Sequence, residues 1–184
     1  MNSLKNPSWE TGTFANWTVA GNIFIYADPA YPVHTGHYSM GTNDDGNITQ
    51  TVNIAVANIT ECSIWVYGDF TLGLGTKITV TFNYSDLTSS QFIHTTNLGE
   101  SATWVKLDMI GSLTAGKTVV SIILAPSFNG GGALIFCDDV YMDGGPPNIS
   151  GSGSKKIGFI WFLLSVLLES HKPPVRLFRN KTRV

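Results

Sequence analysis

Short strand-like runs recur through the first 145 residues of this 184-residue chain, separated by turn-forming residues. Glycine, asparagine, aspartate and proline stand between the runs, and no helical period of useful length appears before residue 155. Strands are predicted over residues 22–27, 37–41, 48–54, 61–67, 77–84, 91–95, 103–109, 118–124 and 133–142. This spacing is typical of an all-β fold, and we expect an antiparallel β-sandwich of two sheets.

Two of the runs indicate which way their side chains face. In the run 77–84, apolar residues alternate with lysine, threonine and asparagine, so one side is predicted to be buried and the other to face water. In the run 61–67, Trp65 and Tyr67 share the side opposite Cys62, Ile64 and Val66. Because this run carries bulk on both sides, its Trp and Tyr side is predicted to face a groove.

The low charge of the chain excludes one class of partner. Charged residues make up 13% of the sequence, the formal net charge is -2, and no stripe of lysine and arginine crosses the first 150 residues. Proteins bind the phosphate backbone of nucleic acids through such a basic stripe, so nucleic acid is not expected as a partner.

The two cysteines, Cys62 and Cys137, each stand inside an apolar run and far apart in sequence. They do not form a Cys-x-x-Cys pair, which excludes a zinc site. A disulfide between neighbouring strands and two buried free thiols both remain open.

Three segments are expected along the chain. The sandwich occupies residues 1–145, a linker rich in proline, glycine and serine follows over 146–156, and a short apolar segment with a basic tail fills 157–184. The apolar stretch falls short of the roughly 20 residues that span a bilayer, so a weak interfacial membrane contact is one interpretation. A truncated spanning helix, a segment docking on a neighbouring domain and a tail encoded out of frame are the others.

The first residues lack the apolar core of a secretory signal. The chain is therefore expected to be part of a larger polypeptide, or to leave its cell by a route without such a signal, as virion components do. In either case we expect it to be extracellular or displayed on a surface.

Six sequence landmarks follow one another in a recognisable order. The chain opens with NPSWETG and FANW between residues 6 and 17, followed by HTGHYSM (34–40), ITQTV (48–52), SIWV (63–66), WVKL (104–107) and IFCDDV (135–140). The ordered set resembles the carbohydrate-binding modules of the family 4/9 type and their galactose-binding-like jelly-roll relatives. Trp9 stands where that family usually has Phe, Cys137 stands where an aliphatic residue is common, and nothing matches after Gly145.

The resemblance implies a jelly-roll sandwich that binds a glycan without catalysis and attaches a larger protein or assembly to it. The same sandwich also hosts structural and adhesion modules, so a module of a virion or cell-surface assembly is the alternative function. No Ser or Cys stands in a nucleophile motif near the histidines, and no carboxylate pair has a glycosidase setting. An enzyme is therefore not expected.

The resemblance also implies a structural calcium ion held between the opening segment and the last strand, where Glu10 and Asp138 match the family. Calcium takes six to eight oxygen ligands, so Asp139 and the loop 43–47 are further candidates. Strand alternation predicts that Asp138 and Asp139 point to opposite faces. The alternative is that these acids are solvated or hydrogen-bonded to the backbone.

Aromatic side chains are candidate sugar platforms, because the apolar face of a pyranose stacks on a ring. Trp65 and Tyr67 are the first choice, and the further candidates are Tyr26, Tyr31 and Trp104, with Gln91 and His94 as polar partners. Trp9 and Trp17 match core positions of the family and are predicted to pack inside. Ordinary packing is the alternative for each of the ring candidates.

Overall fold

The computed structural model describes residues 2–42, 44–69, 76–96, 100, 102–128 and 134–144. The predicted linker over 146–156 and the predicted apolar segment and basic tail over 157–184 lie outside these residues, and so does the predicted membrane contact. Within the described ranges, no helix has the length and hydrophobicity that crossing a bilayer requires.

Ten strands form within the described residues, and no α-helix occurs among them. The strands are β1 (Thr18–Gly21), β2 (Phe24–Ala27), β3 (Tyr38–Thr42), β4 (Gly46–Ala55), β5 (Ile59–Asp69), β6 (Thr76–Tyr84), β7 (Ser89–Thr95), β8 (Trp104–Asp108), β9 (Thr118–Phe128) and β10 (Leu134–Gly144). Two short 3₁₀ turns, η1 (Val56–Asn58) and η3 (Ile110–Ser112), lie before β5 and after β8.

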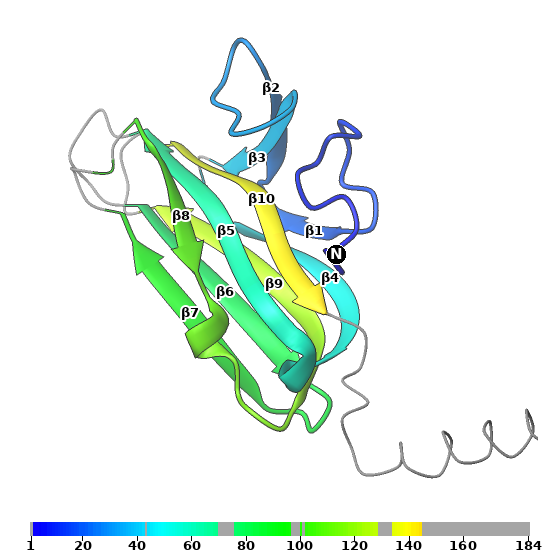
Figure 1. Ribbon diagram of the computed structural model, residues 1–184. Coiled ribbons are helices and arrows are strands. Elements are labelled where there is room, and N and C mark those ends of the chain that lie inside the picture. The colour runs from blue at the N-terminus through cyan, green and yellow to red at the C-terminus, as the bar shows by residue number, and fades with distance from the viewer. Residues whose placement is uncertain are drawn as a thin grey trace, which may run out of the picture. The chain divides into compact units, whose positions relative to one another are not determined.

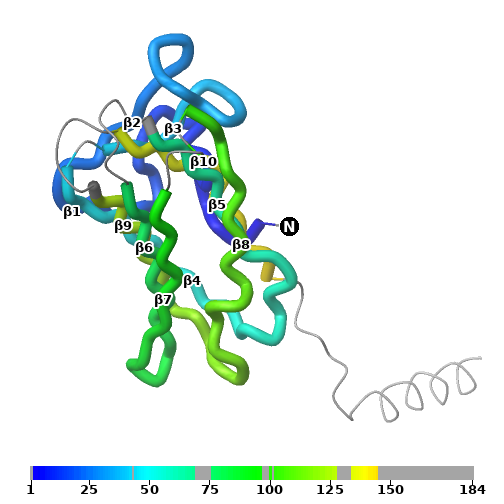
Figure 2. The backbone as a smooth tube through the Cα atoms, turned by 90° about the vertical axis from the view of Figure 1, so that its left-hand side faces the viewer, coloured from blue at the N-terminus to red at the C-terminus, as the bar shows by residue number. Residues whose placement is uncertain are grey.

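The strands form two five-stranded antiparallel sheets (Figure 1). Sheet A has the order β2-β3-β10-β5-β8, and sheet B has the order β1-β4-β9-β6-β7. Figure 2 shows the sandwich from its side, with β6, β7 and β9 in one layer and β5, β8 and β10 in the other. The expected two-sheet antiparallel sandwich is confirmed.

Each of the nine predicted runs corresponds to a strand, and β1 is the strand that the sequence pattern missed. All four residues of β1 are exposed, so it carries no buried face that an alternation would reveal. The predicted run 118–124 also extends to Phe128 in β9, through Pro126. A proline is tolerated there because the pairing of β9 with β4 ends at Leu124, and beyond it only β6 accompanies β9.

The space between the sheets is filled by the residues that the alternation predicted to be buried. Ile78, Val80 and Phe82 of β6 have no exposed surface. Trp9 and Trp17 are also buried, and their ring centroids lie 6.0 Å apart, which confirms that they pack inside. The opening segment is fastened to this core by Gln50, whose amide exchanges two hydrogen bonds of 2.8 Å with the Lys5 backbone.

Cys62 and Cys137 lie on the neighbouring strands β5 and β10, yet both are free and buried. The strand register explains this, because Cys62 pairs with Met142 and Cys137 pairs with Val66. A stagger of several residues along a strand exceeds the reach of a disulfide. Of the two alternatives that the sequence left open, the structure contains two free thiols, and burial raises the pKa of Cys62 to about 12.

Candidate functional site

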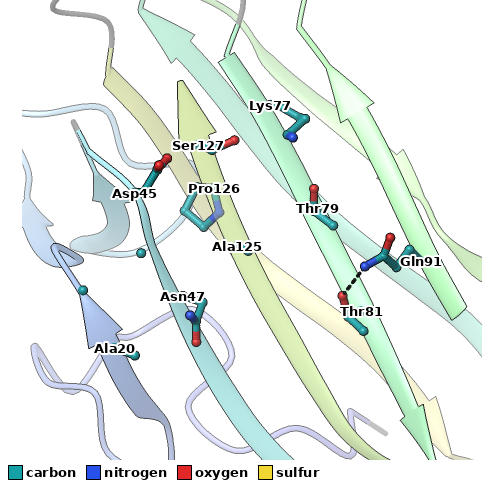
Figure 3. A pocket seen from close by; sticks show the side chains of 12 residues that line it. Ala20, Asp45, Asn47, Lys77, Thr79, Thr81, Gln91, Ala125, Pro126 and Ser127 are labelled. Atoms are coloured by element: carbon teal, nitrogen blue, oxygen red, sulfur yellow. Dashed lines mark hydrogen bonds between the residues drawn. The ribbon is translucent and has the colours of Figure 1, made fainter. Parts of the chain in front are cut away.

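A groove with a volume of about 750 Å³ crosses the outer face of sheet B (Figure 3). All five strands of the sheet contribute to it, together with Asp45 just before β4. Its lining residues are Ala20, Gly21, Asp45, Gly46, Asn47, Lys77, Thr79, Thr81, Gln91, Ala125, Pro126 and Ser127. The groove therefore uses the side of β6 that the sequence predicted to face water.

The groove is hollow because its middle carries small side chains. Ala125 of the central strand β9 is the register partner of Thr79 of β6. Both side chains are short, so neither rises far above the sheet. Longer side chains border this floor, with Asp45 and Asn47 on one side and Lys77 on the other (Figure 3).

The groove presents hydrogen-bonding groups of every kind. The Gln91 amide donates a hydrogen bond of 3.3 Å from Nε2 to Thr81 Oγ1, which orients the amide and leaves its oxygen available to a ligand. The carboxylate of Asp45 and the ammonium group of Lys77 form no ion pair with any described side chain. Such a lining suits a ligand that is polar over its whole length and carries no strong net charge.

The outer face of sheet A carries a different set of side chains, which we call the aromatic surface. Its ring residues are Phe24, Tyr26, Tyr31, His34, Trp65, Tyr67, Trp104 and Phe136. Neighbouring ring centroids in this set lie between 3.9 Å (His34 to Trp65) and 6.3 Å (Phe24 to Tyr26) apart. The rings therefore form one continuous cluster at the usual distances of aromatic pairs.

Strand register aligns part of the aromatic surface into a row. Phe24, Gly41, Phe136, Tyr67 and Trp104 are successive register partners across β2, β3, β10, β5 and β8. Gly41 is required in this row, because a Cβ there would lie 2.9 Å from the Phe136 ring and 3.0 Å from the Tyr26 ring. The glycine gives both rings room to meet over β3.

The segment between β2 and β3 folds over sheet A and adds Tyr31 and His34 to the aromatic surface. Asp138 of β10 holds it by accepting backbone N–H groups of His34 (3.0 Å) and Thr35 (3.2 Å). Asp139 holds the same two residues through His34 Nδ1 at 2.7 Å and the Thr35 hydroxyl.

The prediction that Asp138 and Asp139 point to opposite faces is therefore wrong. Asp139 has a φ of 44°, and the register of β10 against β5 shifts between Asp138 and Tyr141. This β-bulge interrupts the alternation and turns both carboxylates toward the same segment.

Asp138 has no exposed surface, and burial, followed by the nearby Asp139 charge, raises its pKa to about 7. A carboxyl group whose pKa is raised on folding favours the folded state only while it is protonated. The stability that protonated Asp138 contributes is therefore fully present below the unfolded pKa of about 4 and is lost as the pH rises toward 7. The Asp138 carboxylate accepts the backbone N–H groups of His34, Thr35 and Asp139, which is the hydrogen-bonded alternative to a metal ligand; a cation beside it would further compensate the buried charge.

Glu10, the other acid that matches the calcium position, supports the same segment as Asp138. Its carboxylate accepts the backbone N–H groups of His37 (2.9 Å) and Tyr38 (3.3 Å). Gly36 leaves room for it, because a Cβ at that position would lie 2.2 Å from the carboxylate. No three His, Cys, Asp or Glu side chains gather around a metal position in the described part of the chain, so an ion here would also need backbone or hydroxyl oxygens.

The seven residues predicted to bind sugar fall into two groups. Trp65, Tyr67, Tyr26, Tyr31 and Trp104 are all brought together in the aromatic surface. Gln91 lines the groove on sheet B, and His94 lies on the same strand, 3.2 Å from the Glu100 carboxylate. The structure therefore separates the two polar partners from the rings that they were expected to assist.

Sequence reasoning missed most of the groove and three members of the aromatic surface, Phe24, His34 and Phe136. Thr79, Thr81, Asn47 and Lys77 carry no signal beyond being polar residues in strand positions. Phe136 stands within the landmark IFCDDV, and its alternation with Cys137 places it on the outer side of β10.

Comparison with known proteins identifies the fold. Neither a family model nor a curated protein matches the sequence. Among solved structures, the chain is similar to TmCBM61 in complex with β-1,4-galactotriose, with 22% identity, a TM-score of 0.58 and coverage of 77% of this chain and 97% of that one.

Two further structures give the same result. The C-terminal family 22 carbohydrate-binding module of Clostridium thermocellum Xyn10B has 12% identity and a TM-score of 0.53, with coverage of 80% of this chain and 98% of that one. The K1 cleaved adhesin domain of Lys-gingipain from Porphyromonas gingivalis has 12% identity and a TM-score of 0.56, with coverage of 76% and 96%. This chain thus has the jelly-roll fold of carbohydrate-binding modules, while the family 4/9 type stays a prediction.

Proposed function

We propose that this chain is a non-catalytic glycan-binding module and that the glycan lies in the groove on sheet B. The groove itself carries the proposal, because its volume of about 750 Å³ is on the scale of ligand sites and its rims offer amide, hydroxyl and charged groups. A glycan needs many such partners at once, since each buried hydroxyl left unpaired weakens binding. In this role the module attaches a larger protein or assembly to a polysaccharide outside the cell or on a surface.

The groove is favoured over the aromatic surface as the main site because the rings are largely engaged with one another. Trp65 has the His34 imidazole stacked on it at 3.9 Å, and Tyr67 packs against both Trp104 and Phe136. A ring that is already covered on one side offers less surface to a sugar than a free one.

The test is affinity electrophoresis of the full chain in gels that contain soluble polysaccharides, including β-1,4-galactan and xylan. These two are chosen because the similar structures include modules described with β-1,4-galactotriose and as xylan-binding. We expect retardation in at least one gel, and a loss of at least tenfold in affinity for the double variant Gln91→Ala, Thr79→Val.

The matched control is Asn53→Ala, which removes an exposed amide on β4 outside the groove and should leave retardation unchanged. Trp65→Ala separates the two surfaces and should retain most of the binding. Passage of the wild-type chain through every gel without retardation, or equal retardation of the groove variant, would contradict the proposal.

A calcium ion beside Glu10 and Asp138 is the second part of the proposal. The buried carboxylate of Asp138 and the shared support of residues 34–38 by both acids favour it. Thermal unfolding with added Ca²⁺ or with EDTA tests it. We expect Ca²⁺ to raise the Tm of the wild type but not of Asp138→Asn, while Glu61→Gln, which changes an exposed acid on β5, keeps the response. An identical Tm with Ca²⁺ and with EDTA would exclude the ion.

The alternative function is that of a structural or adhesion module of a virion or cell-surface assembly. The similarity to an adhesin domain supports it. Recovery of the chain in purified particles, or an oligomer whose interface covers Trp65, would favour this alternative.

A further inference from the structure

The aromatic surface is not sealed from solvent, although its rings pack on one another. Phe136 forms the floor with 1% of its surface exposed, whereas Phe24 is 48% and Tyr31 is 42% exposed. Trp65, Tyr67 and Trp104 are half-buried. The exposed parts of Phe24 and Tyr31 leave room for a partner above them.

The composition of the surface restricts the kind of partner. All eight side chains of the set contain rings, and six of them also carry an O–H or N–H group. Rings with polar edges match a sugar, which has an apolar face bordered by hydroxyls.

Hydrogen-bonding groups border the rings. Lys106 of β8 is the register partner of Trp65, and its ammonium group lies 2.8 Å from the Glu61 carboxylate. Both side chains of this pair are 47% exposed, so they retain free hydrogen-bonding capacity toward solvent. The Thr35 hydroxyl, which donates a hydrogen bond to Asp139, follows His34 in the segment that covers Trp65.

We infer that the aromatic surface is a second sugar-binding surface, independent of the groove, so that one molecule of this protein holds two glycan segments at once. This inference rests on the proposed glycan-binding function. The two surfaces belong to the outer faces of opposed sheets, and sheets in a sandwich pack about 10 Å apart before the outer side chains are counted. A short oligosaccharide therefore occupies one surface or the other, and a long polysaccharide is cross-linked.

The experiment measures cross-linking and binding separately. Light scattering first measures the oligomeric state of the full chain. The chain is then mixed with the soluble polysaccharide that retards it, either β-1,4-galactan or xylan, and turbidity is recorded. We expect the wild type to precipitate the polysaccharide. The double variant Phe24→Ala, Tyr31→Ala should still be retarded in the gel but should lose precipitation, with avidity reduced roughly tenfold or more.

The matched control is Leu87→Ala, which removes a 97% exposed apolar side chain at the β6–β7 hairpin and should leave precipitation unchanged. Calorimetric titration with the corresponding oligosaccharide should give two sites for the wild type and one for the aromatic double variant.

The possible outcomes distinguish a second sugar-binding surface from the proposed binding of a glycan in the groove. A wild type that binds with one site and does not precipitate the polysaccharide would overturn the second surface and leave the groove proposal intact. A wild type that binds no glycan would remove both. If the double variant instead dissolves a dimer seen with the wild type, the aromatic surface is an interface between copies and the inference fails.

Discussion

The outer faces of the two sheets differ at the strand that lies in the middle of each. In sheet A the central strand is β10, which presents Phe136, and six further rings and His34 gather around it. In sheet B the central strand is β9, which presents Ala125 and Ser127, and a groove lies over them. The face whose central strand presents a large ring is thus filled by its own residues, and the face whose central strand presents small side chains is hollow.

The comparison predicts unequal costs for truncating the two faces. Phe136→Ala should lower the free energy of unfolding by about 3–5 kcal/mol, because it removes the buried floor of the aromatic surface. Thr79→Ala on sheet B should change it by no more than about 0.5 kcal/mol, because this side chain lines an open groove. Urea denaturation of both variants measures the difference, and equal costs would show that the aromatic surface contributes no packing.

A smaller effect is expected from the glycine that lets the rings meet. Gly41→Ala should cost about 1–3 kcal/mol, because its Cβ would lie 2.8 Å from the Ile135 carbonyl oxygen and press on two rings. Gly111→Ala is the control, since nothing lies within 4 Å of a Cβ at that position. The same denaturation experiment applies, and a neutral Gly41→Ala would mean that the rings over β3 are loosely packed.

A large ring placed at the centre of sheet B should remove the difference between the two outer faces. Ala125→Phe should fill the groove and reduce glycan affinity at least tenfold, which corresponds to about 1.4 kcal/mol. The free energy of unfolding should stay close to that of the wild type, because the added ring lies on an outer face. Affinity electrophoresis together with denaturation checks both parts, and undiminished retardation would place the glycan elsewhere.

The smallest effect concerns the exposed acid of the β6–β7 hairpin. Hydrogen bonds from Thr88 and Lys117 lower the pKa of Asp86 to about 2. A lowered pKa stabilises the folded state above the unfolded value of about 4, and this contribution is lost as the pH falls toward 2. Asp86→Asn should therefore be slightly less stable than the wild type at pH 6 and equal to it near pH 2. A difference that persists at pH 2 would point to a cause other than ionisation.

The strands and the ring-bearing side of β5 could be predicted from sequence because both depend on alternation. Trp65 and Tyr67 stand opposite Cys62, Ile64 and Val66, and the structure has this arrangement. The alternation failed where the backbone departs from a regular strand, at the bulge that turns Asp139 to the same side as Asp138.

The groove could not be predicted in the same way, because it is defined by side chains that are small. Ala20, Ala125 and Thr79 come from three strands and meet only through the order β1-β4-β9-β6-β7. Except across the β6–β7 hairpin, neighbouring positions in this sheet are distant in sequence, so no local pattern marks them. The sequence predicts Gln91 as a polar partner, but its place opposite Thr81 depends on the pairing of β6 with β7.

The central claim, that a glycan lies in the sheet B groove, is tested most directly by mapping amide chemical shifts. The isotopically labelled full chain is titrated with the oligosaccharide of the polysaccharide that retards it. The account predicts saturable shifts at Thr79, Thr81, Gln91 and Ser127, whatever happens on sheet A. Saturable binding that leaves these four amides unmoved would contradict it.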